Sequence, residues 1–404
     1  MQSRLAWFSL GAVLTALGLF LIYQLPPVKY RVEWRLDALN GIVRGWIRPA
    51  ETLPTPIGMA GRPVVRATTR VTPAAGPSPS PSPTWPPLPS SARLPSPAWD
   101  KQDWNNCGPA TLALALRMFG WEGDQFDISD LLKPDRGDKN VNVEELVYYV
   151  RTRAGWMNAD FRVGGTLETL KRFLAAGYPV IVEKGLWLAQ DEAGGGWSGH
   201  YLLLTGYDDG QRVFVTQDSY KGADQLVSYA SLDELWQTFN RVFLYLYRPE
   251  DQAEIEMLLG PDAEVDRNRR RALEAAQAEI ELEPENPYAW FNLGTNLVYF
   301  ERYGEAADAF DTALAIGLPW RFTRYQFGPY IAYFNQGRFE DVIELADATL
   351  FRTYKAEESM LWRGWARYRL GDVLGAIEDF RAALAVNPAY PDALYALEYV
   401  GSSP

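Results

Sequence analysis

The chain has 404 residues, of which 47% are hydrophobic and 14% aromatic, and its formal net charge is −12 at pH 7. This length allows two or three domains with packed cores. The acidic balance excludes nucleic-acid binding through clustered lysine and arginine. Because there is one cysteine and one histidine, intrachain disulfides and metal sites built from several cysteines are excluded, and we expect no metal and no cofactor.

An apolar segment covers residues 5–23, with the sequence LAWFSLGAVLTALGLFLIY. Its 19 residues are close to the roughly 20 that a helix needs to cross a bilayer. Since residues 24–27 (Gln-Leu-Pro-Pro) offer no small-x-small cleavage site, we expect an uncleaved transmembrane anchor. A cleaved signal peptide and a buried core helix stay open as alternatives. Positive charges on both sides, at Arg4 and at Lys29 and Arg31, give no clear orientation.

A juxtamembrane segment (residues 24–50) and a Pro/Ser-rich linker (residues 51–97) follow the apolar segment. Aromatic and β-branched residues over 28–50 predict a short strand pair. Residues 72–97 contain ten prolines among Ser, Thr, Ala and Gly, which predicts an extended spacer. Recognition of the polyproline by a partner is the alternative. We expect the spacer to hold the bulk of the chain on the extracytoplasmic side of the membrane.

A globular domain is expected over residues 98–250, with helices mostly before strands, which favours an α+β fold. A hairpin signal, Asp208-Asp209-Gly210, joins two of its strands. The expected helices cover 111–119, 143–153 and 167–176, and the expected strands cover 178–182, 201–207, 212–216 and 243–247.

Residues 264–402 are helical and repetitive. Phe310, Ala346 and Phe380 hold equivalent places, separated by 36 and 34 residues. This period resembles the tetratricopeptide repeat, and the resemblance implies an all-α solenoid that binds a protein partner. Three units are expected, preceded by a half unit (271–282) and followed by a capping helix (392–399), and the middle unit departs from the small-residue pattern.

Cys107 stands at the expected start of a helix. Asn105 or Asn106 suits the N-cap, and Pro109 suits the first turn. A thiol in this place faces the positive end of the helix macrodipole, which favours the nucleophilic thiolate. A buried cysteine that packs as a small hydrophobic side chain is the alternative.

His200 follows a glycine-rich stretch and opens a strand, a setting that lets backbone and substrate approach a general base. Asp218 ends the next strand, and residues 200 and 218 are equidistant from position 209 at the hairpin turn. Simple antiparallel pairing then places Asp218 beside His200, where it orients the ring. An ordinary buried histidine and an ordinary turn aspartate are the alternatives.

The motif Asn-Cys-Gly-Pro-Ala at residues 106–110, the motif Gly-His-Tyr at 199–201, and Asp218 together resemble the C39-like cysteine peptidases of the papain-like superfamily. The helix and strand over 167–182 add to this resemblance, which covers about residues 98–248. It implies a nucleophile at Cys107, a general base at His200 and an orienting acid at Asp218.

The resemblance also implies an oxyanion donor ahead of the cysteine, for which Gln102 is the candidate. The bacteriocin-processing branch is expected to carry its glutamine six residues ahead, whereas Gln102 stands five ahead. Asn105, Asn106 or the Cys107 backbone N–H are alternative donors.

The cleft is expected to involve Asn106, Gly108, Trp197 and Gly199. Trp187 and Trp197 flank the loop 189–196, and they form either a cleft wall or lid near His200, or surface aromatics that pack on the domain.

These residues favour a membrane-anchored, extracytoplasmic cysteine peptidase that acts on a peptide or protein and binds a protein partner through its repeats. An amidase or a transglutaminase-type acyl transferase would use the same three residues. An inactive papain-like domain that serves with the repeats as a binding scaffold is the alternative from another class.

Overall fold

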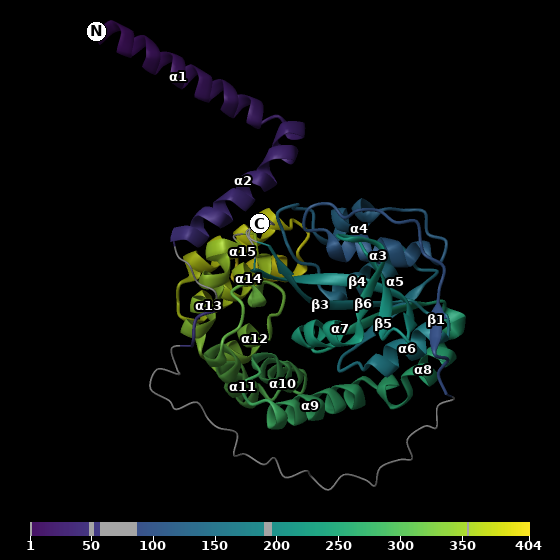
Figure 1. Ribbon diagram of the computed structural model, residues 1–404. Coiled ribbons are helices and arrows are strands. Elements are labelled where there is room, and N and C mark those ends of the chain that lie inside the picture. The colour runs from purple at the N-terminus through teal and green to yellow at the C-terminus, as the bar shows by residue number, and fades with distance from the viewer. Residues whose placement is uncertain (1, 48–51, 57–86, 190–195, 354) are drawn as a thin grey trace.

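The computed structural model describes residues 2–47, 52–56, 87–189, 196–353 and 355–404 (Figure 1). Most of the predicted polyproline spacer and most of the loop expected between Trp187 and Trp197 lie outside the described residues. An α+β domain and a helical array make up the body of the molecule, and two successive helices precede them (Figure 1).

The two N-terminal helices correct two predictions. The residues expected to form a transmembrane anchor lie in α1 (Gln2–Tyr23), yet no helix among the described residues is both long enough and apolar enough to cross a membrane. The predicted transmembrane segment is therefore wrong, and the extracytoplasmic location of the bulk of the chain stays a prediction. The strand pair expected over 28–50 is also wrong, because α2 (Pro26–Ile47) occupies all of these residues that the structure describes. This helix opens on prolines that suit a first helical turn.

One antiparallel sheet forms the centre of the α+β domain, with strand order β2-β7-β3-β4-β5-β6 and β1 beside β4. The strands are β1 (Ser91–Arg93), β2 (Asn158–Arg162), β3 (Val180–Leu188), β4 (Gly196–Asp208), β5 (Val213–Asp218), β6 (Gly222–Ser228) and β7 (Phe243–Tyr247). The strands expected from sequence are present, but β1, β2 and β6 were not predicted.

Helices cover both faces of this sheet. On one face, α3 (Cys107–Arg117), α4 (Gln125–Leu132) and α5 (Val143–Arg153) share a core with β4 residues such as Tyr201 and Leu203. On the other face, α6 (Leu167–Ala175), α7 (Tyr229–Trp236) and α8 (Gln252–Leu259) pack on Leu202 and Leu204. The alternation of these four strand residues explains how one strand serves two cores.

The helical array extends from α9 to α16, as the repeat period predicts. Its helices are α9 (Val265–Leu282), α10 (Pro287–Tyr299), α11 (Tyr303–Ile316), α12 (Gly328–Asn335), α13 (Phe339–Arg352), α14 (Glu357–Arg369), α15 (Val373–Val386) and α16 (Pro391–Tyr399). Gly294 and Gly364 hold equivalent places, since a Cβ on them would lie 2.6 Å from the Phe310 ring and 2.5 Å from the Phe380 ring. Close helix pairing therefore requires these glycines.

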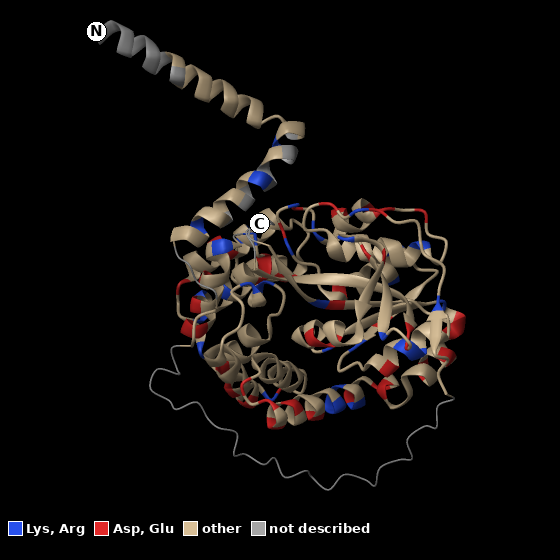
Figure 2. Cartoon of the chain, in the orientation of Figure 1, with Lys and Arg blue, Asp and Glu red and all other residues tan. Residues whose placement is uncertain are grey.

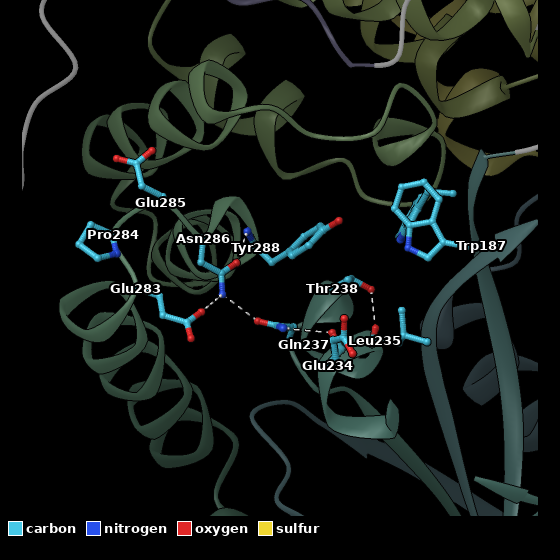
Figure 3. Close-up of a pocket in the computed structure, with 11 residues that line it drawn as sticks. Trp187, Glu234, Leu235, Gln237, Thr238, Glu283, Pro284, Glu285, Asn286 and Tyr288 are labelled. Carbon is cyan, nitrogen blue, oxygen red and sulfur yellow. Dashed lines mark hydrogen bonds between the residues drawn. The ribbon is translucent and has the colours of Figure 1, made fainter. Parts of the chain in front are cut away.

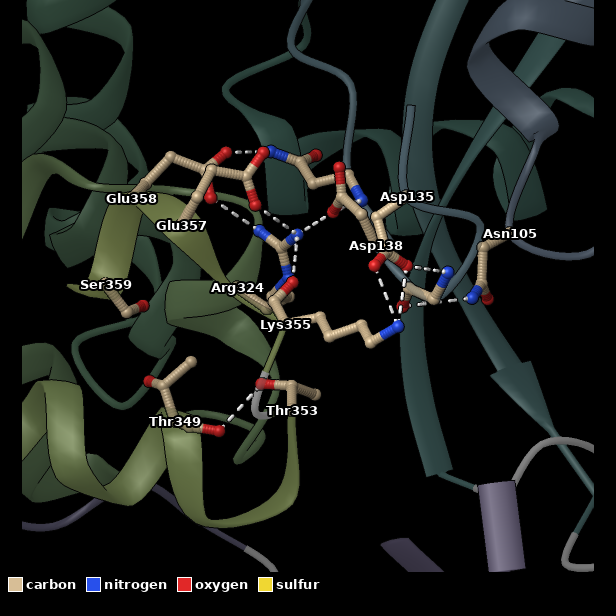
Figure 4. Close-up of polar contacts among 12 residues, drawn as sticks. Asn105, Asp135, Asp138, Arg324, Thr349, Thr353, Lys355, Glu357, Glu358 and Ser359 are labelled. Carbon is tan, nitrogen blue, oxygen red and sulfur yellow. Dashed lines mark hydrogen bonds and ion pairs between the residues drawn. The ribbon is translucent and has the colours of Figure 1, made fainter. Parts of the chain in front are cut away.

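The helical array lies alongside the α+β domain rather than apart from it (Figure 1). The segment between α11 and α12, which includes the short 3-10 helix η5 (Phe322–Arg324), carries Arg324 with an exposed fraction of 0%. Its guanidinium forms ion pairs with Asp138 of the α+β domain and with Glu358 of α14, the latter at 2.8 Å (Figure 4). Lys355 joins the same contact by donating to Asp135 at 2.8 Å. A buried charge cluster thus connects the two parts.

We expect Arg324→Met to lower the free energy of unfolding by about 3 to 5 kcal/mol, because it leaves buried carboxylates from both domains without their cation. Arg302→Met is the matched control, because the Arg302–Glu305 ion pair is exposed on the surface of the array and is worth at most about 1 kcal/mol. Urea unfolding of both variants measures the difference. Equal losses in the two variants would show that the buried cluster does not hold the domains together.

Candidate active site

Cys107 is the first residue of α3 and is partly exposed. Asn106 is the N-cap, one of the two residues predicted for this position, although its side chain forms no cap hydrogen bond. The Asn106 amide instead donates to Gln125 Oε1 at 2.9 Å. Asn105 takes φ +54°, a left-handed conformation that asparagine tolerates, and this turns the chain into the helix. The N–H groups of Cys107 and Gly108, the first of α3, therefore have no capping side chain as acceptor.

His200 lies on β4 and Asp218 at the end of β5, and the structure brings their side chains together. His200 Nε2 is 2.9 Å from Asp218 Oδ1. The pairing register differs from the predicted one, because Gln217 lies opposite Leu203 and a bulge follows Leu204. Asp218 is therefore beside Leu202, and it reaches His200 diagonally across the strand pair. The predicted neighbour is right, although the predicted register is off by two residues.

Asp218 holds the imidazole ring while it also closes a turn. Its Oδ1 accepts hydrogen bonds from the backbone N–H groups of Tyr220 at 2.8 Å and Lys221 at 3.1 Å. The sequence predicted that Asp218 is either a turn residue or the neighbour of His200, and its carboxylate has both roles. Because Nε2 contacts Asp218, Nδ1 is the ring nitrogen left for the Cys107 thiol.

The charges of the pair support each other. Burial alone would raise the pKa of the Cys107 thiol, but the hydrogen bond and charge of His200, helped by the Tyr201 N–H, lower it. Burial alone would lower the pKa of His200, but hydrogen bonds to Asp218 and Cys107 raise it to about 9. The lowered pKa of Cys107 and the raised pKa of His200 both favour a thiolate beside an imidazolium, which is the reactive form of such a pair.

Gln102 is hydrogen-bonded to Ser219, the residue that follows Asp218. Its backbone N–H donates to Ser219 O at 2.8 Å, and its side-chain Oε1 accepts from Ser219 Oγ at 2.9 Å. This bond directs the amide N–H groups of Gln102 away from Ser219. The catalytic role predicted for Gln102 stays a prediction.

Three charged residues near the pair were missed from sequence. Lys184 lies directly opposite His200 on β3, and burial lowers its pKa to about 8 although Asp218 opposes the shift. Its neighbour Glu183 lies opposite Tyr201, and burial raises the pKa of Glu183 well above the ordinary value. The sheet is otherwise largely uncharged (Figure 2), so this charged pair inside an apolar strand was a usable signal.

Lys133 is the third missed charge. It follows α4, and its exposed fraction is 3%. Burial lowers the pKa of Lys133 to about 8, and the negative charge of Cys107 is the first influence that opposes the shift. The loop sequence around it, Leu-Leu-Lys-Pro-Asp, gave no signal of a place near the thiol.

Tyr325 brings the helical array to the site. Its hydroxyl is 2.7 Å from Ser198 Oγ, two residues before His200. A Cβ on Gly199 would lie 3.0 Å from the Tyr325 ring and 2.9 Å from Phe239, so glycine is needed for this close approach.

The expected cleft residues differ in exposure. Gly108 is buried, and a Cβ there would lie 3.3 Å from the Tyr201 ring. Trp197 is 1% exposed and stacks on Phe239 at 5.6 Å, whereas Trp187 is 63% exposed. Trp197 therefore packs inside the domain. Trp187 is exposed at the surface. The described ranges contain no cluster of three His, Cys, Asp or Glu side chains that could hold a metal ion.

The lone histidine gives one imidazole signal, so an NMR titration reports on His200 alone. We expect its proton to leave at pH about 9, because Asp218 and Cys107 hold the charged form. Asp218→Asn removes one of these charges and should move the titration down toward the ordinary value of about 6.5. Asp208→Asn, at the other end of β4, is the control and should leave it unchanged. An unshifted wild-type titration near 6.5 would contradict the described electrostatics.

Two family descriptions match the chain. Residues 93–248 match the Peptidase_C39 like family, and residues 257–317 and 331–397 match the tetratricopeptide repeat. The resemblance found from the sequence motifs is thereby confirmed for both parts of the chain. Among curated proteins, none matches the chain.

Solved structures with similarity to the chain fall into two groups. A candidate C39-like peptidase from Bacillus anthracis is 19% identical and covers 40% of this chain and 99% of its own, with a TM-score of 0.32. Xylellain, a cysteine protease from Xylella fastidiosa, is 14% identical over 40% of this chain and 87% of its own, with a TM-score of 0.31. MamA from Desulfovibrio magneticus RS-1 is 14% identical over 37% of this chain and 82% of its own, also with a TM-score of 0.31.

Proposed function

We propose that this chain, which joins a C39-like peptidase domain to tetratricopeptide repeats, is a cysteine peptidase that hydrolyses peptide bonds through an acyl-enzyme at Cys107. The observation that carries the proposal is the contact of one thiol at a helix start with one imidazole, which a buried carboxylate holds in place. A nucleophile, a base and an orienting group within hydrogen-bond reach are what thiol acyl transfer requires.

The reaction follows from these positions. The Cys107 thiolate attacks the substrate carbonyl carbon, and the carbonyl oxygen becomes an oxyanion at the start of α3, where the Cys107 N–H is a donor. His200 gives its proton to the leaving amine, which breaks the C–N bond and leaves a thioester. A water molecule then loses a proton to His200 and attacks the thioester, and this step releases the carboxylic acid and restores the thiolate–imidazolium pair.

The surroundings favour the charged pair in this proposal. Lys133 places a buried cation near the thiolate, which supports the negative charge between turnovers. Asp218 supports the imidazolium, and its own pKa stays low because the hydrogen bond and charge of His200 outweigh the effect of burial. The protein partner expected for the repeats stays a prediction, since the contacts described above join the repeats to the peptidase domain.

Alkylation of the thiol by iodoacetamide tests the nucleophile directly, because Cys107 is the only cysteine. In the folded full-length chain we expect the rate against pH to rise with an apparent pKa well below about 8.5, the ordinary thiol value. His200→Gln should move the profile up, because the thiolate loses its counter-ion. The urea-unfolded chain is the internal control and should titrate near about 8.5. Coincident folded and unfolded profiles would remove the basis of the proposal.

Incubation with a peptide mixture and mass spectrometry of the products tests the reaction class. We expect new free carboxyl termini with the wild-type chain and none with Cys107→Ser. Methylamine added to the mixture separates the transferase alternative, which would yield methylamides instead of acids. An activated thiol without any product would favour the binding-scaffold alternative.

A further inference from the structure

A cavity of about 810 Å³ lies between the peptidase domain and the first repeat (Figure 3). The peptidase side supplies Trp187 and residues around the end of α7, and the repeat side supplies the turn between α9 and α10. Trp187 lies on one side of the view and Glu283 to Glu285 on the other, with Tyr288 between them. The residues that line the cavity are Trp187, Trp197, Glu234, Leu235, Gln237, Thr238, Glu283, Pro284, Glu285, Asn286 and Tyr288.

An aromatic contact connects the cavity wall to the strand that carries His200. Trp197 is three residues from His200 on β4, about 10 Å along the strand at roughly 3.3 Å per residue, and this odd spacing directs the two side chains to opposite faces of the sheet. Trp197 also contacts Tyr325 edge to face at 5.7 Å, and Tyr325 is bonded to Ser198.

The lining residues make the cavity negative. Three of them are glutamates, and none of the described lining residues is a lysine or an arginine. Glu234 and Glu283 are exposed, and Glu283 accepts only a long hydrogen bond of 3.4 Å from Asn286 within the described part of the chain. Unpaired carboxylates in one cavity attract a cation and repel an acidic ligand.

Aromatic side chains supply a second feature that does not depend on charge. Trp187 is 63% exposed at the cavity wall, although a large aromatic on a solvent-facing strand end normally packs on a neighbour. Tyr288 lies in the same cavity, partly exposed. Trp197 is 1% exposed, and its indole N–H is a buried donor without an acceptor in the described structure. Of the three rings, those of Trp187 and Tyr288 have exposed surface, and an exposed aromatic face binds a guanidinium or an ammonium.

We propose that this cavity is a subsite for the side chain of an arginine or lysine in the peptide substrate, a few residues from the scissile bond. The carboxylates neutralise the cation, Trp187 and Tyr288 hold the aliphatic part and the charged group, and residues of both domains form the subsite together. The repeat domain thereby takes part in substrate selection. The inference rests on the proposed peptidase function, because it assigns a substrate class to the same site.

Binding to the full-length Cys107→Ser variant tests the subsite without turnover. The probes are two fluorescein-labelled twelve-residue peptides of Gly, Ala and Gln that differ only at two central positions, which are Arg-Arg in one and Gln-Gln in the other. By fluorescence anisotropy at low salt we expect the arginine peptide to bind about tenfold more tightly. Equal affinities would overturn the proposal.

Variants of the lining residues test whether the preference for the arginine peptide arises in the cavity. Glu234→Gln combined with Glu283→Gln should make the affinities for the two peptides equal, and so should Trp187→Ala. All three side chains are exposed, so we expect these variants to keep the hydrophobic core. Glu274→Gln combined with Glu281→Gln removes two exposed charges of α9 outside the cavity and should leave the preference intact. A preference that survives in the cavity variants, or disappears in the α9 control, would overturn the proposal.

These binding results are distinct from a failure of the peptidase proposal. If Cys107 alkylates like an ordinary thiol and no peptide is cleaved while the arginine preference depends on Glu234 and Glu283, the subsite stands and the catalytic proposal falls. If peptides are cleaved with no preference for basic residues, the catalytic proposal stands and the subsite falls.

Discussion

The arrangement of the whole molecule depends on one buried cation. Arg324 is fully enclosed and meets carboxylates from two parts of the chain, Asp138 on the peptidase side and Glu357 and Glu358 on the repeat side. Charges taken out of water are tolerated only when each has its counter-charge, so neither domain can leave the other without exposing or stranding part of this cluster. Burial and the charge of Glu358 raise the pKa of Glu357 to about 8, which shows how little water reaches the cluster. The repeats are therefore a fixed wall of the peptidase domain rather than a tethered arm.

The same exclusion of water shapes the chemistry of the thiol. Burial acts against the thiolate and against the imidazolium separately, and only their mutual contact, with Asp218 behind the ring, makes both charges favourable. Tyr325 follows Arg324 directly in the chain, so the residue that anchors the repeats also fixes the aromatic ring over Gly199. A loosened interface would admit water beside His200, and the two pKa values would move back toward their ordinary positions. The pKa values of Cys107 and His200 therefore depend on the packing between the two domains.

The sequence predicted those parts of the site that depend on contiguous residues. The helix start at Cys107, the strand at His200 and the turn after Asp208 follow from local periodicity and turn chemistry, and they bring Asp218 close enough even though the register was off. The repeats were predictable because the same spacing recurs. The rest depends on contacts between distant residues: Tyr325 meets Ser198 across 127 positions, and no local pattern encodes such a meeting. The N-terminal segment shows the opposite error, in which composition suggested a membrane span and a strand pair where the structure has helices without a span among the described residues.

Repeat arrays commonly bind a partner protein on one face, and here one face of the array packs against the other domain of the same chain. Amide side chains join the two domains where they meet, since Asn240 and Asn296 bond each other reciprocally at 3.0 and 3.3 Å and Asn292 donates to Gln237 O at 2.8 Å. Such bonds are directional, so they hold the two walls at a set separation rather than letting them collapse on each other. The acidic cavity lies at the same interface, with Gln237 in its lining. A side chain that enters a preformed cavity loses its own conformational freedom, but no loop or domain has to be ordered around it.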